Sequence, residues 1–162
     1  MIAAPLPDDE DQRLAALRAL LILDTPPEER FDRIVAFAAS EFDVPMALIS
    51  LVDSDRQWFK SRIGLSACET ARDVSFCAHV VHDRETLLVS DALRDPRFHD
   101  NPLVTGDPHI RFYAGAPLTL KSGAVVGTLC VLDTRERSFD AIDRSILESL
   151  RLLVVAELER TA

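Results

Sequence analysis

The sequence predicts a single α+β domain in which helices pack on an antiparallel sheet. Its 162 residues, 48% apolar and 28% charged, suit one globular domain with a real core. Two pairs of strand-like runs are each joined by a few turn residues, which indicates hairpins and therefore antiparallel pairing. Helical periodicity marks both ends of the chain. This order favours a sheet with helices packed on it over a doubly wound α/β fold.

The chain is expected to begin with a flexible arm over residues 1–8, so that the domain itself spans 9–162. Leu14, Leu17 and Leu21 then repeat at helical spacing, which predicts a short helix ending near residue 23.

A second helix is predicted from the stretch TPPEERF. Thr25 is a good N-cap and Glu28 follows three residues later, the pattern of a capping box. The apolar face of this helix comprises Phe31, Ile34, Val35, Ala38 and Phe42. The helix should stop before Pro45, because the residue before a proline disfavours helical geometry.

Two strands are predicted next. Residues 46–52 are apolar on both faces, as in a buried central strand, and residues 57–63 alternate. The turn residues between them predict a hairpin. Residues 74–81 have helical spacing, with Asp73 as the expected N-cap, and residues 86–90 form a short strand.

The last third holds a long loop, a hairpin and a helix. Residues 91–109 contain three prolines and a glycine, and loops this long are often functional. Asn101 is a turn or cap residue there. Strands 110–120 and 124–133 form the second hairpin, and a long amphipathic helix starts near Asp140.

The strand IRFYAGAPL has two dissimilar faces. One is apolar, and the other carries Arg111, Tyr113, Gly115 and Pro117. Hydrogen-bonding groups beside a residue without a side chain raise the possibility of a bound small molecule. A structural alternative is that Arg111 fastens the loop by pairing with an aspartate at position 91, 95 or 107.

Composition excludes several classes of partner and location. The net charge of −9 disfavours nucleic acids and anionic membranes. No apolar run reaches the ~20 residues of a membrane span, and the N-terminus does not read as a secretory signal. Three widely spaced cysteines suit free thiols in a reducing cytoplasm, where the protein is expected to reside.

The runs SLVDSDRQWFKSRIG, SFCAH, LLVSDALRDPRFHDNPLV, IRFYAGAPL and GTLCVLD occur in an order that resembles GAF domains, over roughly residues 12–160. The resemblance is to the bacterial sensor type found ahead of two-component histidine kinases and cyclic-di-GMP enzymes. It implies a PAS-related central antiparallel sheet, with terminal helices on one face and a pocket-forming layer of loops and helices on the other. GAF pockets take varied ligands, so the fold does not name one.

The resemblance places strand 110–120 on the pocket floor and loop 91–109 at its wall. We therefore predict a cavity lined by Phe76, Asp91, Phe98, Arg111 and Tyr113. For Phe98 the alternative is a core plug that pins the loop.

Metal and enzyme chemistry are not expected. Cys77 and His79 point in different directions on a helix, so they do not make a metal site with His82. One GAF branch reduces free methionine sulfoxide with pocket cysteines, but the stretches around these cysteines do not match it. Cys77 and Cys130 lie in apolar patterns and should label slowly, after Cys68.

The predicted function is a non-catalytic sensor that binds an unidentified small molecule and relays occupancy through its terminal helices. The alternatives are a sulfoxide reductase-like enzyme and a dimerisation scaffold with an empty pocket. Leu152 and Val155 lie off the main apolar stripe of the last helix, to which Leu153 is assigned. Wide apolar faces predict a homodimer through residues 10–23 and 141–160. Fusion to a kinase or cyclase output domain is also expected.

Overall fold

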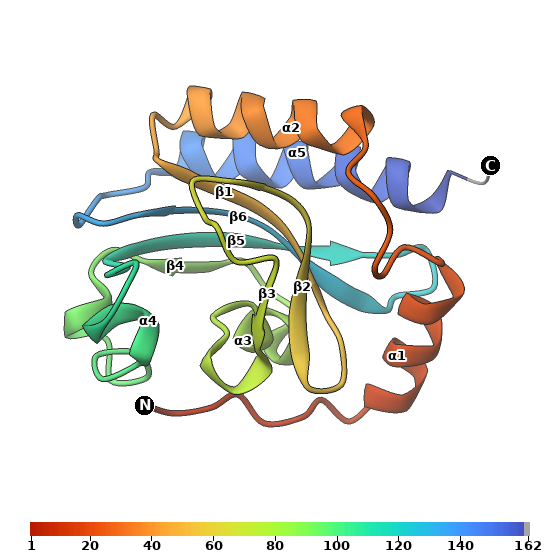
Figure 1. Ribbon diagram of the computed structural model, residues 1–162, viewed down its shortest axis with the longest axis horizontal. Helices are drawn as coiled ribbons and strands as arrows, with labels where there is room; N and C mark the ends of the chain where they lie inside the picture. The colour runs from red at the N-terminus through yellow and green to blue at the C-terminus, as the bar shows by residue number, and fades with distance from the viewer. Residues whose placement is uncertain (161–162) are drawn as a thin grey trace.

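A six-stranded antiparallel sheet of order β3-β2-β1-β6-β5-β4 forms the centre of the molecule (Figure 1). The computed structural model describes residues 1–160. The strands are β1 (Met46–Val52), β2 (Arg56–Ile63), β3 (Glu69–Ala71), β4 (Leu87–Val89), β5 (Phe112–Thr119) and β6 (Val125–Asp133). Both predicted hairpins are confirmed, as β1 pairs with β2 and β5 with β6. The short β3 was not predicted.

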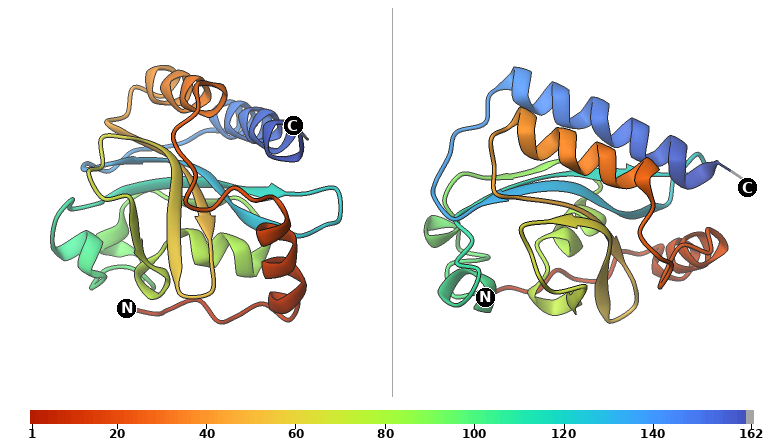
Figure 2. Two further views of the ribbon diagram at one scale, coloured as in Figure 1. Left: turned by 45° about the vertical axis from the view of Figure 1, so that its right-hand side comes forward. Right: turned by 45° about the horizontal axis from the view of Figure 1, so that its top comes forward.

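Helices lie on both faces of this sheet. They are α1 (Glu10–Ala19), α2 (Glu29–Glu41), α3 (Cys77–Asp83), α4 (Pro102–Thr105) and α5 (Ala141–Glu159), with 3-10 turns at Arg72–Val74 and Ala92–Arg94. Helices α2 and α5 run side by side over one face, and α3, α4 and the long loops cover the other (Figures 1 and 2). In the part of the chain that is described, no helix is long and apolar enough to cross a membrane.

Strand alternation gives each face of the sheet its own apolar core. Phe112 and Ala114 belong to the core beneath α2 and α5, which also holds Leu147. Tyr113 belongs to the core on the α3 side, together with Phe76. Neighbouring residues of β5 therefore touch different layers, which couples the two layers through one strand.

Helix α2 starts later than predicted and without the expected capping box. Its N-cap is Glu28, which makes no side-chain capping bond. Thr25 instead donates to the Ile22 carbonyl over 2.5 Å and accepts a hydrogen bond from Lys60. Glu28 forms ion pairs with Lys60 and Arg30. The predicted capping box does not form because Lys60, a buried lysine on β2, binds both Thr25 and Glu28. The predicted apolar face of α2 is buried.

Helix α3 does not have the predicted cap, because its N-cap is Phe76, which makes no side-chain capping bond. A 3-10 turn takes up Asp73, and the Ser75 hydroxyl accepts the Ala78 amide instead. The predicted cap at Asn101 is confirmed, and the last helix starts at Asp140 with a capping box that was not predicted. Asn101 accepts the Leu103 amide at the start of α4, and Asp140 forms a reciprocal capping box with Asp143 at the start of α5.

The arm over residues 1–8 lies against the loop layer. The Ile2 amide donates to the Arg97 carbonyl over 3.0 Å, and His79 Nε2 donates to the Ile2 carbonyl over 3.0 Å. Burial lowers the pKa of His79, although the hydrogen bond to Ile2 acts to raise it. The flexibility of the arm remains a prediction.

The two segments predicted to form a dimer surface, residues 10–23 and 141–160, are arranged differently from the expectation. Helix α1 sits at one end of the sheet, apart from α2 and α5 (Figure 2). Leu21, assigned to the buried stripe of α1, is 82% exposed. Leu153, assigned to the main stripe of α5, is also exposed, because the buried side of α5 consists of Leu147, Leu150, Val154 and Leu158.

Candidate functional site

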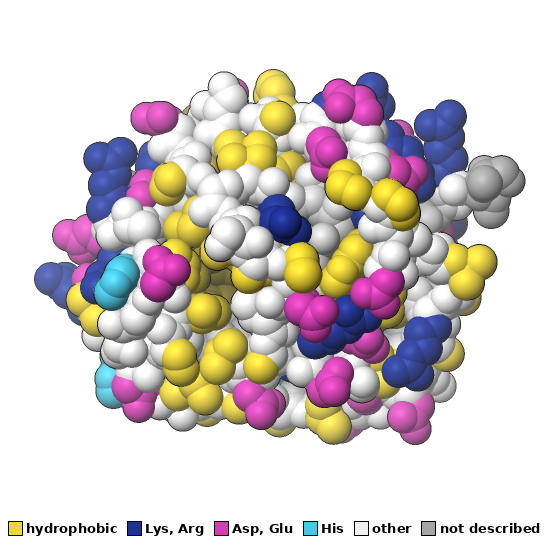
Figure 3. Space-filling view, viewed as in Figure 1, with side chains coloured by type: hydrophobic (Ala, Val, Ile, Leu, Met, Phe, Trp, Pro, Cys, Tyr) yellow, Lys and Arg dark blue, Asp and Glu magenta, His cyan; other side chains and the backbone are white. Residues whose placement is uncertain are grey.

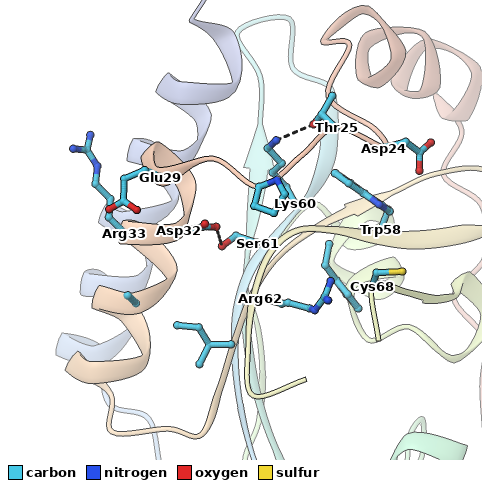
Figure 4. A pocket seen from close by; sticks show the side chains of 14 residues that line it. Asp24, Thr25, Glu29, Asp32, Arg33, Trp58, Lys60, Ser61, Arg62 and Cys68 are labelled. Atoms are coloured by element: carbon cyan, nitrogen blue, oxygen red, sulfur yellow. Dashed lines mark hydrogen bonds between the residues drawn. The ribbon is translucent and has the colours of Figure 1, made fainter. Parts of the chain in front are cut away.

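A large open groove lies between α2 and β2 (Figure 4). It has a volume of about 860 Å³ and mixes acidic and basic side chains. Much of its charge is already paired. Lys60 is held by Glu28 at 2.7 Å and Thr25 at 2.8 Å, and Ser61 donates to Asp32 over 2.6 Å. This mutual pairing favours a structural role for the groove.

A smaller hollow, a cavity of about 120 Å³, lies on the opposite face of the sheet. Figure 3 shows a depression with hydrophobic side chains on this side of the molecule. Strands β1, β5 and β6 form the floor, and α3 and the loops around residues 65–70 and 103–110 form the walls. The lining comprises Met46, Leu48, Gln57, Phe59, Leu65, Ser66, Ala67, Thr70, Phe76, Cys77, Leu103, Asp107, Pro108, Ile110, Tyr113, Cys130 and Leu132.

Strand register positions the floor of this cavity. Met46 pairs with Leu132 and Leu48 with Cys130, so alternate residues of β1 and β6 point to the same side. Tyr113 of β5 pairs with Leu132 and extends that row. The floor is therefore apolar except for one thiol and one hydroxyl.

Gly115 creates the room that Tyr113 needs. A Cβ atom on Gly115 would lie 2.2 Å from the Tyr113 hydroxyl oxygen, because residues two apart on a strand share a face. The hydroxyl lies across the glycine and is 3.2 Å from Cys77 Sγ. The polar face noticed in the sequence thus meets a helix thiol at the cavity rather than bulk solvent.

Cys77 is the centre of a buried polar cluster. Thr128 donates to its Sγ over 3.0 Å, and Tyr113 lies on another side. Burial acts to raise the pKa of Cys77, but hydrogen bonds with Cys130, Thr128, Tyr113 and Ser50 outweigh it and lower the pKa to about 6. Burial and the neighbouring Cys77 raise the pKa of Cys130. Cys77 therefore ionises first.

The structure brings together two of the five predicted site residues. Phe76 and Tyr113 line the cavity, with ring centroids 5.1 Å apart. Phe98 stacks on Phe76 at 4.0 Å and is 1% exposed, so it is the core plug of the alternative interpretation.

The other two predicted residues fasten the loop layer. Asp91 accepts the Leu93 amide and caps the 3-10 turn that follows it. Arg111 donates to the backbone carbonyls of Val104 and Ile110 over 2.8 and 3.0 Å, rather than to a loop aspartate. Neither is among the residues that line the cavity, because Arg111 precedes β5 and turns toward α4.

Sequence reasoning did not place the two buried cysteines in one cavity. Their burial is confirmed, as Cys77 and Cys130 are buried and Cys68 is exposed. Helical and strand periodicity placed each in an apolar pattern, but neither pattern shows that α3 packs over β6. Within residues 1–160 no cluster of three or more His, Cys, Asp or Glu side chains could hold a metal ion.

Comparisons with known proteins agree with this architecture. A sequence model described as GAF domain matches residues 26–158. A cyclic di-GMP phosphodiesterase of Pseudomonas aeruginosa is 44% identical over 159 residues, which cover 98% of this chain. The chain spans only 27% of that relative's length.

Two solved structures show the same fold at low sequence identity. The GAF domain of a phosphoenolpyruvate-protein phosphotransferase from Coxiella burnetii is 15% identical with a TM-score of 0.68, over 90% of this chain and 92% of that one. A free methionine-R-sulfoxide reductase from Neisseria meningitidis, in complex with its substrate, is 17% identical with a TM-score of 0.67, over 98% and 95% of the two chains.

Proposed function

Because the chain belongs to the GAF domain family, we propose that it is a non-catalytic sensory domain whose ligand occupies the cavity beneath α3. The observation that carries this proposal is the cavity itself, set on a sheet whose other face carries the C-terminal helix. Occupancy acts on the sheet, and the sheet acts on α5.

Size and charge restrict the ligand. An apolar cavity of about 150 Å³ holds a benzene ring, and this one measures about 120 Å³. Its lining contains one carboxylate, Asp107, and no lysine or arginine. A nucleotide is too large and finds no cation for its phosphate. We propose a neutral molecule no larger than a small ring, with one hydrogen-bonding group for Tyr113.

Three hydrogen bonds connect α5 to β5, to the residue before β4 and to the β5–β6 turn. Arg151 donates to the Pro117 carbonyl of β5 over 3.3 Å. Thr86, next to β4, donates to Glu148 over 2.7 Å. The Lys121 amide in the β5–β6 turn donates to Glu159 over 2.8 Å. A shift of Tyr113 therefore moves a strand to which α5 is bonded directly.

The output we propose is control of cyclic di-GMP turnover, and it rests on the Pseudomonas aeruginosa relative. We propose that α5 carries the mechanical signal to such an output domain, because it packs on the sheet face opposite the cavity. We place the protein in the cytoplasm, since all three cysteines are free.

The main alternative is an enzyme that reduces free methionine sulfoxide. Two buried cysteines that share a cavity favour it. The charges oppose it, because a free amino acid brings a carboxylate and an ammonium group and the lining offers no cation for the carboxylate.

Phenol is a suitable probe, since it combines a small ring with one hydroxyl. We expect calorimetry to show saturable binding with a Kd on the order of 1 mM, given the few atoms of the ligand. The variant Leu65→Trp should abolish binding, because Leu65 is half-buried at the cavity wall.

The matched control is Leu93→Trp, which places the same side chain at an exposed position outside the cavity lining. It should bind phenol like the parent, whereas 2-naphthol should bind to neither. Equal binding of phenol to both variants would show that the cavity is not the ligand site.

We also propose a homodimer, with α2 and α5 as its surface. Phe37, Ile142, Leu152 and Leu153 are between 53% and 70% exposed on these helices. Aspartates at Leu152 and Leu153 should raise the dimer dissociation constant at least about tenfold in sedimentation experiments, since charges oppose apolar burial. A parent chain that sediments as a monomer at high concentration, or a fully dimeric variant, contradicts this surface.

A further inference from the structure

Two cysteines from distant parts of the chain meet inside the cavity. Cys77 opens α3 and Cys130 lies in the middle of β6, and both line the hollow. Thr128 and Cys130 project from the same side of β6, because they are two residues apart. Thr128 reaches Cys77 at 3.0 Å, so Cys130 lies beside the same sulfur. Both cysteines belong to the same apolar core cluster on this side of the sheet.

The surroundings of the two sulfurs are unequal. Cys77 receives the Thr128 hydroxyl and faces the Tyr113 hydroxyl at 3.2 Å. These groups stabilise a negative charge on the Cys77 sulfur. Cys77 is therefore the nucleophile, and Cys130 remains a neutral thiol. The proposed sensory function does not use this difference between the two thiols.

We propose that Cys77 and Cys130 form a redox-sensing dithiol that is oxidised by a small alkyl hydroperoxide entering the cavity. The inference rests on the proposed sensory role and makes a covalent change one of the signals that the cavity receives. A disulfide here joins α3 to β6 and removes Cys77 as the partner of Tyr113.

The chemistry balances in two steps. The Cys77 thiolate attacks the terminal oxygen of the hydroperoxide, the O–O bond breaks, and the alkoxide leaves and takes a proton to become the alcohol. Cys77 is now a sulfenic acid. The Cys130 sulfur attacks that sulfur, the S–S bond forms, and hydroxide leaves with the Cys130 proton as water. Two thiols lose two electrons, and the hydroperoxide gains them.

The cavity selects the oxidant by size and polarity. Apolar walls such as Leu48 and Phe59 favour an alkyl group, and a volume of about 120 Å³ admits a butyl group more readily than an aryl-substituted one. The hydroxyl of Tyr113 lies 3.2 Å from Cys77 Sγ, and we assign it as the proton donor to the departing oxygen. The same restriction slows bulky thiol reagents, which agrees with the predicted slow labelling of both buried cysteines.

The test uses the Cys68→Ser chain, in which Cys77 and Cys130 are the remaining cysteines. With tert-butyl hydroperoxide we expect intact mass to fall by about 2 Da and both free thiols to disappear, reversibly with dithiothreitol. Cumene hydroperoxide should react at least about tenfold more slowly, because it is too large for the cavity. Retention of both free thiols, or equal rates with the two hydroperoxides, would overturn the proposal.

Two further variants assign the roles. In Cys68→Ser with Cys130→Ala, the sulfenic acid on Cys77 should persist and react with dimedone. Tyr113→Phe removes one donor while keeping the ring, so oxidation should slow about fivefold and the midpoint of its pH–rate profile should move upward. If the alanine variant does not fold, the Tyr113→Phe profile decides, and an unshifted midpoint rejects the assigned nucleophile.

The phenol experiment separates this inference from the proposed function. Phenol binding to a chain whose thiols resist the hydroperoxide rejects the dithiol and leaves the ligand cavity in place. Disulfide formation in a chain that does not bind phenol would support the dithiol and reject the cavity as the ligand site.

Discussion

Replacing Gly127 with alanine should destabilise the domain by about 3 kcal/mol, the upper end of the ~1–3 kcal/mol that overpacking typically costs. Gly127 lies in β6, between Leu51 of β1 and Leu118 of β5. A Cβ atom there would lie 1.9 Å from the Ser50 carbonyl oxygen. Backbone atoms in the middle of a sheet cannot move away as a flexible side chain can, so the β1–β6 pairing has to open. Chemical denaturation measures the effect.

The control is Gly106→Ala, the same substitution in a loop. Its Cβ would meet one carbonyl, that of Pro102, at 3.0 Å, so we expect a loss below about 1 kcal/mol. If Gly127→Ala were as mild as its control, the close contact between β1 and β6 that organises the cavity floor would be wrong.

Replacing Arg13 with methionine should cost about 2–4 kcal/mol, the range expected when a buried charge network loses a member. Arg13 is 1% exposed although it belongs to the short helix α1. Its guanidinium donates to the Val52 carbonyl at the end of β1 over 2.7 Å and is paired with Glu10 at 2.9 Å. Methionine fills similar space but leaves a buried carbonyl without its donor. The free energy of unfolding measures the loss.

Acid titration provides a second readout of this network. Burial acts to raise the pKa of Glu10, but hydrogen bonds from Arg72 and Arg13 lower it from 4.5 to about 2. A depressed folded-state pKa stabilises the fold above pH 4.5, and that contribution is lost as the pH falls toward 2. In Glu10→Gln this part of the acid dependence should vanish. An unchanged pH profile in that variant would remove Glu10 from the network.

The sequence supported the fold better than the site, for physical reasons. Strand alternation and hairpin turns are local, so β1, β2, β5 and β6 could be placed from a few residues each. The cap at Thr25 failed because its partner, Lys60, comes from a strand 35 residues away. The three-residue β3 has too little periodicity to be seen.

Site prediction depended on which loop side chains turn inward. Tyr113 was found because strand alternation places it on the polar face of β5. Arg111 and Asp91 satisfy backbone groups of the loop itself, and no pattern in the sequence separates that role from ligand binding. The Cys77–Cys130 pair depends on the packing of α3 on β6, a tertiary contact that local sequence patterns do not show.

The central claim is that occupancy of the cavity is transmitted through the sheet to α5, and amide NMR shifts during a phenol titration test it most directly. Leu150 and Val154 of α5 face the core on the side of the sheet away from the cavity. We predict that their amide signals shift with the same apparent Kd as those of Phe76 and Tyr113, and that Leu65→Trp abolishes both sets of shifts. Saturable shifts confined to the cavity lining, with α5 unchanged, would contradict the relay.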